Sequence, residues 1–314
     1  MIEPVLPYES VLLTGANGFV GRHLLSALRT RLAPGATVHC LDRRGEAPVS
    51  LLDTVAVHAF VERSRPDLII HLAAQSSVAQ STGSAADTWR VNVGGTLNLA
   101  EAVAIVSPEA VFAFVSSSEV YGTAFNFGRV DEKTVPTPSS VYARTKRAAE
   151  EALADTLGPA NRLVIFRPTN HSGPGQDERF VLPSFANQIA KIEAGNLSPV
   201  LKVGSLSAER DFLDVRDVVD AYMRVLTEPG TDRCQIYNVS SGHPVPINDI
   251  LDHLLEMSLT NILVEQDPAR MRPSEVPRTD IDSSALRIQT NWAPQFTLRD
   301  MVTDVLAAAR RRQK

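Results

Sequence analysis

The sequence contains only two cysteines, Cys40 and Cys234, among 314 residues. Both lie in apolar stretches, so we expect buried free thiols rather than the disulfide framework of a small secreted protein. No apolar run reaches the roughly 18 residues that a membrane-spanning helix needs. The first residues, MIEPVLPYES, lack the basic and apolar pattern of a secretory signal. These absences predict a cytoplasmic protein that has no membrane partner.

An excess of positive charge is also missing. The 31 Lys and Arg residues stand against 36 Asp and Glu residues, which gives a formal net charge of −5. A mildly acidic chain has no electrostatic reason to bind nucleic acid, so none is expected as a partner. The basic end at 310–314 is interpreted as the solvated end of a helix, where cations favour the helix dipole. No metal site is expected.

Apolar segments of strand length alternate with segments of helical periodicity along the first half of the chain. This alternation predicts an α/β fold, a Rossmann-type doubly wound parallel sheet. The strands are apolar without alternation, which indicates burial on both faces. The expected strands lie at about 11–13, 37–41, 67–72, 111–115, 163–166, 235–239 and 262–265. The first expected helix follows the first strand and ends near 32, and the other expected helices lie at about 85–106, 141–156, 180–194, 247–258 and 298–312.

Proline, glycine and asparagine become frequent after residue 167. Loops interrupt the helices there, which is typical of a lobe added to a core sheet. We expect a dinucleotide-binding core at 1–167 with returns at about 211–240, a smaller C-terminal substrate lobe from 168–210 and 240–290, and a C-terminal helix in 291–314.

The stretch 11–24 reads VLLTGANGFVGRHL, a strand followed by a glycine-rich turn and the start of a helix. Among Gly15, Gly18 and Gly21, one glycine permits a tight turn, one lets the backbone approach a pyrophosphate, and one lets the helix pack on the strand. The helix then points its first N–H groups at the phosphates. Asp42 ends the next strand, where an acid is expected to bind the adenosine ribose.

Tyr142 and Lys146 are four residues apart in an expected helix and therefore share a face. An ammonium near a phenol favours the phenolate and lowers its pKa from about 10, so Tyr142 is a candidate proton donor or acceptor at a sugar oxygen. Ser117 follows the strand at 111–115, at the sheet edge where ligands bind. Its hydroxyl is expected to hold the reacting oxygen.

These motifs resemble the extended short-chain dehydrogenase/reductases that act on nucleotide sugars. The resemblance rests on TGANGFVG (14–21), HLAA (71–74), SSSEVYG (116–122), the Tyr142/Lys146 pair and NWAP (291–294), and it covers essentially the whole chain. It implies an NAD(P)-dependent oxidoreductase. The implied catalytic residues are Ser117, Tyr142, Lys146 and Glu119.

The resemblance also implies how the dinucleotide is bound. Asp42 suits a free ribose 2′-hydroxyl, whereas Arg43 and Arg44 suit a 2′-phosphate. The balance leans slightly to NAD(H) over NADP(H). Ser50 stands where the family often has an acid that approaches adenine, so Asp53 is not assigned that contact. Residues 168–171 are expected to line the nicotinamide and the sugar, and the implied cofactor-binding residues are Gly15, Asn17, Gly18, Phe19, Val20, Gly21, Asp42, Arg43, Leu72, Ala73, Ala74, Asn92, Tyr142, Lys146 and Pro168.

Two later stretches are similar to those of reductases that act on GDP-4-keto-6-deoxy-D-mannose: RPTNHSGPGQ (167–176) and RDFLDVRD (210–217). A third, RPSEV (272–276), is similar to a stretch shared by these reductases and GDP-mannose 4,6-dehydratases. The forked cation of arginine suits a diphosphate. The implied reaction reduces the 4-keto group to a GDP-6-deoxyhexose such as GDP-D-rhamnose. The implied substrate-binding residues are Ser117, Ser118, Glu119, Asn170, Arg210, Arg272 and Glu275.

Other functions stay open at this point. Glu119 matches the catalytic glutamate of GDP-mannose 4,6-dehydratases, although their signature GITGQDG is absent from 14–21. A nucleotide-sugar epimerase is a further alternative. A redox-sensing binding protein is a third, against which the complete Ser117, Tyr142 and Lys146 set argues. By analogy with the family, the helices at about 85–106 and 140–156 are expected to pair in a homodimer through a four-helix bundle.

Overall fold

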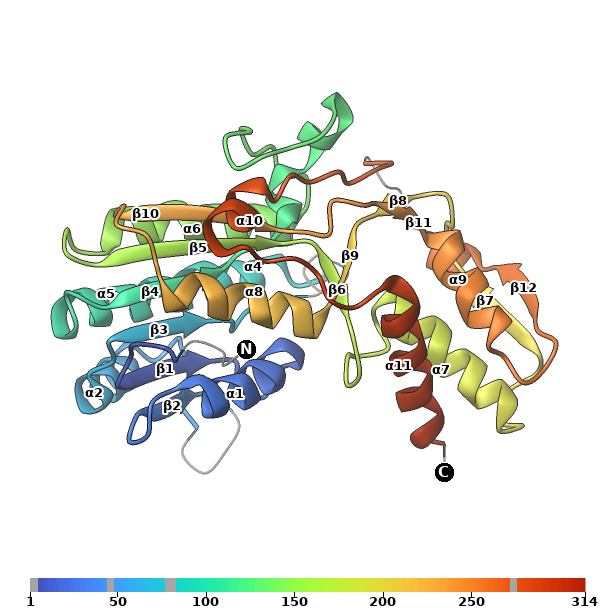
Figure 1. The fold of residues 1–314 in the computed structure, drawn as a ribbon, viewed down its shortest axis with the longest axis horizontal. Coiled ribbons are helices and arrows are strands. Elements are labelled where there is room, and N and C mark those ends of the chain that lie inside the picture. Colours follow the sequence, from blue (N-terminus) through green and yellow to red (C-terminus); the bar gives the residue numbers. More distant parts are fainter. Residues whose placement is uncertain (1–4, 44–47, 77–82, 272–275, 314) are drawn as a thin grey trace.

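The computed structural model describes residues 5–43, 48–76, 83–271 and 276–313 (Figure 1). Six strands form one parallel sheet in the order β10-β5-β4-β3-β1-β2. The order reverses beside β1, because β2 and β3 lie on opposite sides of it, and ligands bind at such a point. The strands are β1 (Ser10–Thr14), β2 (Thr37–Leu41), β3 (Leu68–His71), β4 (Val111–Val115), β5 (Arg162–Pro168) and β10 (Cys234–Val239).

Helices cover both faces of this sheet. Leu13 of β1 packs in the core beneath α1 (Phe19–Arg31), α8 (Val215–Thr227) and α10 (Ser284–Thr290), whereas its neighbour Leu12 packs beneath α2 (Thr54–Ser64), α5 (Gly95–Val106) and α6 (Val141–Thr156). Successive strand residues point to opposite faces, so a sheet covered on both sides needs apolar residues in succession. The predicted Rossmann-type architecture is confirmed.

A smaller lobe lies to the right in Figure 1, beside the carboxyl ends of the strands. Its apolar core joins residues of α7 (Val181–Glu193), α9 (Ile247–Glu256) and α11 (Leu298–Arg311) with β7 (Val200–Val203), which pairs with β12 (Leu263–Gln266). Thus α11, expected as a separate element, shares the core of the lobe, and α10, expected in the lobe, packs on the sheet. Short elements complete the described chain: β6 (Asn170–Ser172), β8 (Glu209–Arg210), β9 (Phe212–Asp214), β11 (Val245–Pro246) and the 3-10 turns Ser118–Tyr121, Thr123–Phe127 and Pro268–Arg270.

Three details differ from the sequence predictions. The single helix expected at 85–106 is divided into α4 (Ala85–Trp89), a π-helical turn (Arg90–Gly94) and α5. Helices α2, α8 and α10 were not predicted. Both cysteines are free as expected, but they are exposed rather than buried. The reason is that β2 and β10 are the two edge strands of the sheet, where a side chain has a neighbouring strand on one side only.

Candidate active site

The glycine-rich turn connects β1 to α1 and has no room for side chains at two positions. Gly15 has a φ of +74°, and a Cβ atom there would lie 2.9 Å from the Ala73 nitrogen. A Cβ atom on Gly21 would lie 2.1 Å from the Gly15 carbonyl oxygen. Gly18 precedes α1 without a side-chain cap, so the first N–H groups of the helix face outward. These features fit a bound pyrophosphate.

Asp42 ends β2 beside this turn. Its Oδ2 atom accepts hydrogen bonds from the Asn17 backbone N–H and from the Asn17 side-chain amide, each at 3.1 Å. The exposed side chain of Arg43 follows it, and Arg44 lies outside the described residues. Asp53 instead caps α2 by accepting the Ala56 N–H at 3.0 Å. The structure therefore gives Asp53 a local structural role and holds Asp42 next to the turn.

A cavity of about 310 Å³ opens at the carboxyl ends of β1, β3, β4 and β5. Most of the predicted site residues line it: Gly15, Gly18, Phe19, Val20, Gly21, Leu72, Ala73, Ala74, Ser117, Ser118, Tyr142, Lys146, Pro168 and Asn170. Asn17, Asp42, Arg43, Asn92, Glu119 and Arg210 do not line it, and Arg272 and Glu275 lie outside the described residues. The lining residues that were not predicted are Ser76, Val115, Ser116, Gln176 and Phe180.

Helix α6 carries two of the candidate catalytic groups into this cavity. The Ser140 hydroxyl caps the helix by accepting the Ala143 N–H at 3.1 Å. Tyr142 therefore stands in the first turn, and Lys146 stands one turn later on the same face. Ser117 follows β4, and its Oγ accepts the Glu119 N–H at 3.2 Å. The cavity thus brings together three polar groups from two elements.

The environment of Tyr142 keeps its phenol protonated. Burial, the strongest influence, raises the pKa of Tyr142, a hydrogen bond with Ser117 opposes the rise, and the charge of Glu119 adds to it. The Lys146 ammonium donates to the Val115 carbonyl at 2.7 Å, and burial lowers the pKa of Lys146 from 10.5 to about 7. The expectation that Lys146 lowers the tyrosine pKa is therefore wrong for this arrangement, because desolvation of the phenolate dominates.

A buried ion pair supports these groups from behind. Arg167 of β5 donates to both carboxylate oxygens of Glu150 of α6, at 3.0 and 2.7 Å, and each residue is 1% exposed. The Ser116 hydroxyl donates to Glu150 at 2.5 Å. Arg167 also donates to the Tyr121 hydroxyl at 3.0 Å, which in turn donates to Asn238 at 2.8 Å. The network joins α6, the end of β4, β5 and β10.

Asn92 was expected near the cofactor, and the structure places it in a supporting position. It lies in the π-helical turn and is 2% exposed. Its side chain accepts the Gln75 N–H at 2.8 Å and donates to the Thr145 hydroxyl at 3.0 Å. Asn92 therefore joins the segment after β3 to α6, beside Lys146. The wider turn brings this side chain inward, as π turns at functional sites often do.

A loop from the lobe covers the glycine-rich turn. The Arg22 guanidinium of α1 donates to the carbonyls of Asn17 and Gly175, both at 3.0 Å. The His171 ring stacks against Phe19 with centroids 6.3 Å apart. Its Nδ1 lies 2.8 Å from the Thr169 carbonyl. A carbonyl only accepts, so Nδ1 carries the proton and Nε2 is left as an acceptor.

Gln176 holds the same loop in shape, since it accepts from the Ser172 hydroxyl at 2.6 Å and donates to the His171 carbonyl at 2.9 Å. Gln176 is the last residue of the RPTNHSGPGQ motif, so the motif could have predicted that it lies in the site. Phe180 had no such signal, because it lies where the chain turns into α7.

The charges of Glu119 and Arg210 act on each other, although neither residue lines the cavity. Burial raises the pKa of Glu119, and the positive charge of Arg210 acts in the opposite direction. Arg210 donates to the backbone carbonyls of Glu209 at 2.8 Å and Val276 at 2.9 Å, which hold its guanidinium in place. A carboxyl whose pKa is shifted by burial is a candidate acid/base residue.

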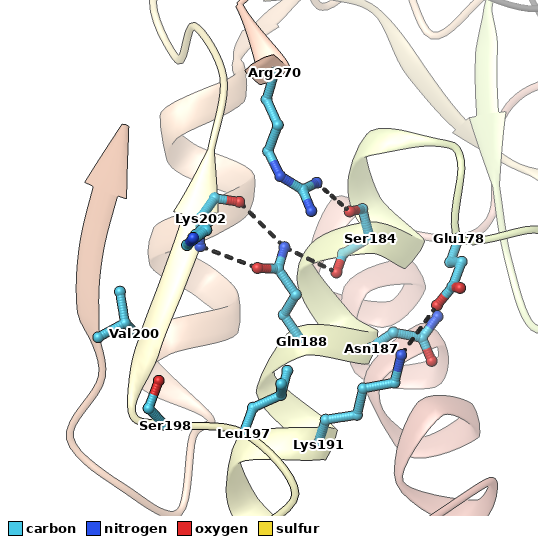
Figure 2. A pocket seen from close by; sticks show the side chains of 10 residues that line it. All are labelled: Glu178, Ser184, Asn187, Gln188, Lys191, Leu197, Ser198, Val200, Lys202 and Arg270. Carbon is cyan, nitrogen blue, oxygen red and sulfur yellow. Dashed lines mark hydrogen bonds and ion pairs between the residues drawn. The ribbon is translucent and has the colours of Figure 1, made fainter. Parts of the chain in front are cut away.

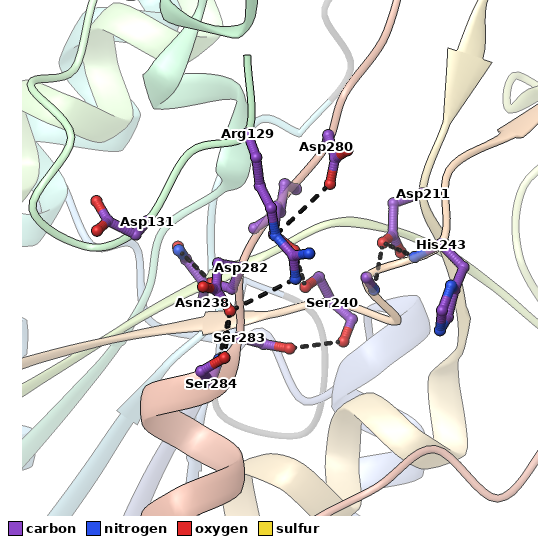
Figure 3. Close-up of polar contacts among 12 residues, drawn as sticks. Arg129, Asp131, Asp211, Asn238, Ser240, His243, Asp280, Asp282, Ser283 and Ser284 are labelled. Atoms are coloured by element: carbon purple, nitrogen blue, oxygen red, sulfur yellow. Dashed lines mark hydrogen bonds and ion pairs between the residues drawn. The ribbon is translucent and has the colours of Figure 1, made fainter.

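Figure 3 shows the polar contacts that support this side of the site. The buried Asp211 carboxylate accepts the backbone N–H groups of Ser241, Gly242 and His243 at 3.0, 2.7 and 3.2 Å. Arg129 pairs with Asp282 at 3.5 Å. These contacts join the turn after β10 to the strand segment that contains the neighbouring Arg210.

The sequence profile described as the NAD dependent epimerase/dehydratase family matches residues 11–240. GDP-6-deoxy-D-mannose reductase of Pseudomonas aeruginosa is 34% identical over 95% of this chain and 96% of its own length. GDP-6-deoxy-D-talose 4-dehydrogenase of Aggregatibacter actinomycetemcomitans is 26% identical over 88% of this chain and 89% of its own.

Two solved structures show the same fold. RMD from Pseudomonas aeruginosa complexed with NADPH has a TM-score of 0.83 and 32% identity, over 96% of this chain and 99% of that one. MoeE5 in complex with UDP-glucose and NAD has a TM-score of 0.85 and 25% identity, over 97% and 100%. Within the described parts of the chain, no helix is long and apolar enough to cross a bilayer.

His71 should make stability sensitive to acid. Its Nδ1 lies 2.7 Å from the Thr14 hydroxyl and its Nε2 lies 2.9 Å from the Thr96 hydroxyl, and burial lowers its pKa from 6.5 to about 3. Below pH 6.5 the unfolded chain takes up a proton that the native protein refuses, so the contribution of His71 to stability is lost as the pH falls from 6.5 toward 3. We compare the unfolding free energy of the wild type with that of His71→Gln. The difference between them should shift against the wild type by at most about 1.4 kcal/mol for each pH unit below 6.5. Urea unfolding from pH 7 to pH 4 measures it, and a constant difference between the two proteins would contradict the assignment.

Proposed function

The chain belongs to the NAD dependent epimerase/dehydratase family, and we propose that it reduces the 4-keto group of GDP-4-keto-6-deoxy-D-mannose to a GDP-6-deoxyhexose such as GDP-D-rhamnose. One observation carries this proposal. Ser117, Tyr142 and Lys146 line a single cavity beside the glycine-rich turn, in a chain related along almost its whole length to GDP-6-deoxy-D-mannose reductase.

A bound NAD(P)H supplies a hydride to C4 of the sugar. Tyr142 donates its phenolic proton to O4 as the hydride reaches C4, so the carbonyl becomes a secondary alcohol. The raised pKa of Tyr142 keeps that proton in place before reaction. Ser117, which shares a hydrogen bond with the phenol, orients O4. Lys146 places a cation beside the phenolate that forms, and its pKa of about 7 lets it return a proton.

The outer residues of the site bind the rest of the substrate. Arg210, held by backbone carbonyls, presents its cation to the diphosphate. Asn170 and Ser118 line the cavity where the sugar lies. Glu119 hydrogen-bonds the sugar, and Arg272 and Glu275 are proposed from the sequence to bind the phosphates and a ribose.

Reduction needs one hydride and one proton, whereas 4,6-dehydration also needs a base at C5 and an acid at C6. We therefore expect GDP-4-keto-6-deoxy-D-mannose to consume reduced cofactor stoichiometrically. Tyr142→Phe should lower kcat by roughly 10²- to 10⁴-fold, because general acid catalysis contributes that much. Glu119→Gln should lower kcat far less. Loss of absorbance at 340 nm and product analysis measure all three proteins.

Two results would contradict this assignment. Near-wild-type turnover by Tyr142→Phe at saturating cofactor would show that another group is the acid. Formation of a 4-keto-6-deoxy sugar from GDP-mannose and NAD(P)+, abolished by Glu119→Gln, would identify a dehydratase instead.

We propose a slight preference for NADH over NADPH. The Asp42 carboxylate is held in place by Asn17 and would repel a 2′-phosphate. The adjacent Arg43 would attract one, which is why the preference is small. Asp42→Asn should raise kcat/KM for NADPH relative to NADH, by roughly tenfold for a 1.4 kcal/mol change. An unchanged ratio of the two kcat/KM values would show that Asp42 does not contact the adenosine ribose.

We further propose a cytoplasmic homodimer. Trp89, Val93, Leu97 and Ile105 follow one another at spacings of four or eight along α4, the π-helical turn and α5, and Trp89 and Ile105 are 41% and 71% exposed. An apolar stripe at this spacing suits pairing with the same helices of a second copy. Sedimentation equilibrium at micromolar concentration should give twice the 34.1 kDa chain mass. A monomer would overturn the proposal, and Ile105→Glu should weaken the dimer.

A further inference from the structure

A second cavity lies in the lobe, between α7 and β7 (Figure 2). Its volume is about 520 Å³, within the roughly 300–1,000 Å³ typical of small-molecule sites. It shares no lining residue with the cavity that contains Tyr142. Among its lining side chains only Leu197 and Val200 are apolar, so an apolar ligand would not suit it.

The charges around this cavity favour an anion. Lys191, Lys202 and Arg270 contribute three positive charges, and Glu178 contributes one negative charge. Lys191 pairs loosely with Glu178, with 3.5 Å between Nζ and Oε2. The guanidinium of Arg270 donates to the Ser184 hydroxyl at 3.3 Å, which directs it toward α7, and its Nε lies 3.6 Å from Oδ2 of Asp267, which offsets part of its charge. Lys202 is exposed, and no contact within the described chain neutralises its ammonium.

Asn187 supplies an independent indication of a ligand. Its side chain is only 5% exposed and lines the cavity. Within the ranges that the structure describes, its amide has no hydrogen-bond partner. The amide atoms of Asn187 are not fully buried, so a ligand in the cavity can reach them and hydrogen-bond with them. Figure 2 shows Asn187 on the same side of α7 as Lys191.

The wall of the cavity is already ordered. The Gln188 side chain of α7 accepts the Lys202 backbone N–H at 3.0 Å and donates to the Lys202 carbonyl at 3.2 Å. The Gln188 side chain thereby makes the two backbone hydrogen bonds that a neighbouring strand would make with β7, and it joins α7 to β7. A site whose shape is set before binding spends less free energy on ordering.

We propose that this cavity is a second binding site, outside the reaction pocket, for a small phosphate-bearing anion. The anion contacts Lys202, Lys191 and Arg270 through its charged oxygens and accepts the Asn187 amide N–H. Such an anion has two possible sources, a free phosphorylated metabolite or the diphosphate of the nucleotide-sugar substrate itself. The two cavities share no lining residue, but Arg210, the proposed contact of the substrate diphosphate, lines neither of them, so the experiment distinguishes the two sources.

Calorimetric titration of the full chain with inorganic pyrophosphate tests the proposal, in the presence of saturating GDP-mannose to occupy the substrate site. We expect Asn187→Ala and Lys202→Gln each to weaken pyrophosphate binding by roughly tenfold, since each removes a hydrogen bond to a charged group. Glu178→Gln should tighten binding by removing a like charge. Lys133→Gln removes an exposed lysine elsewhere and should change nothing. Lys202 is exposed on β7, so Lys202→Gln should fold normally. It therefore tests the site even if Asn187→Ala folds poorly.

Either of two results would overturn the proposal. Unchanged pyrophosphate affinity in Lys202→Gln and Asn187→Ala would show that the anion does not bind in this cavity. Loss of pyrophosphate binding when GDP-mannose is added, together with a raised KM for the nucleotide sugar in Lys202→Gln, would show that the cavity belongs to the substrate site. The titration does not depend on turnover, so it remains readable if the proposed reduction fails.

Discussion

The ion pair between Glu150 and Arg167 is the interaction on which the arrangement of the site depends. It joins α6, which carries Tyr142 and Lys146, to β5, which leads directly into the cavity at Pro168. Burial works against the charge of Arg167, but the hydrogen bonds and charge of Glu150 hold its pKa above the ordinary value. Removing one partner of such a pair leaves an unpaired buried charge and costs about 3–5 kcal/mol. The pair therefore specifies one position of α6 relative to the sheet.

A second chain of hydrogen bonds sets the opposite wall. The Ala73 N–H donates to the Thr14 hydroxyl, His71 lies between Thr14 and Thr96, and the Thr96 hydroxyl donates to the Asn92 carbonyl. The Thr96 hydroxyl donates to the Asn92 carbonyl, so it accepts from Nε2–H of His71, and the neutral ring leaves Nδ1 to accept from the Thr14 hydroxyl. The close approach of Ala73 to the glycine-rich turn depends on this chain. This network also reaches α6, because the Asn92 side chain donates to the Thr145 hydroxyl.

Much of the fold could be predicted because strand and helix periodicity is local. The strands at 37–41 and 111–115 and the helix at 141–156 have the predicted limits. The division of the helix at 85–106 could not be predicted from local periodicity, since the partners of Asn92 in the π turn, Gln75 and Thr145, come from other parts of the chain. The exposure of Cys40 likewise depends on which strands lie at the edges of the sheet. Phe180 was missed because its place in the cavity follows from where the chain enters α7 of the lobe.

By itself the sequence determined the class of the fold, the glycine-rich turn, and the spacing that puts Tyr142 and Lys146 on one helical face. Those features are local, since they follow from backbone sterics and helix periodicity. Only the tertiary structure decided the protonation of these groups. Burial raises the pKa of Tyr142 and lowers that of Lys146, against the simple expectation from their proximity. Desolvation depends on everything that packs around a group, and that environment is assembled from segments far apart in the chain.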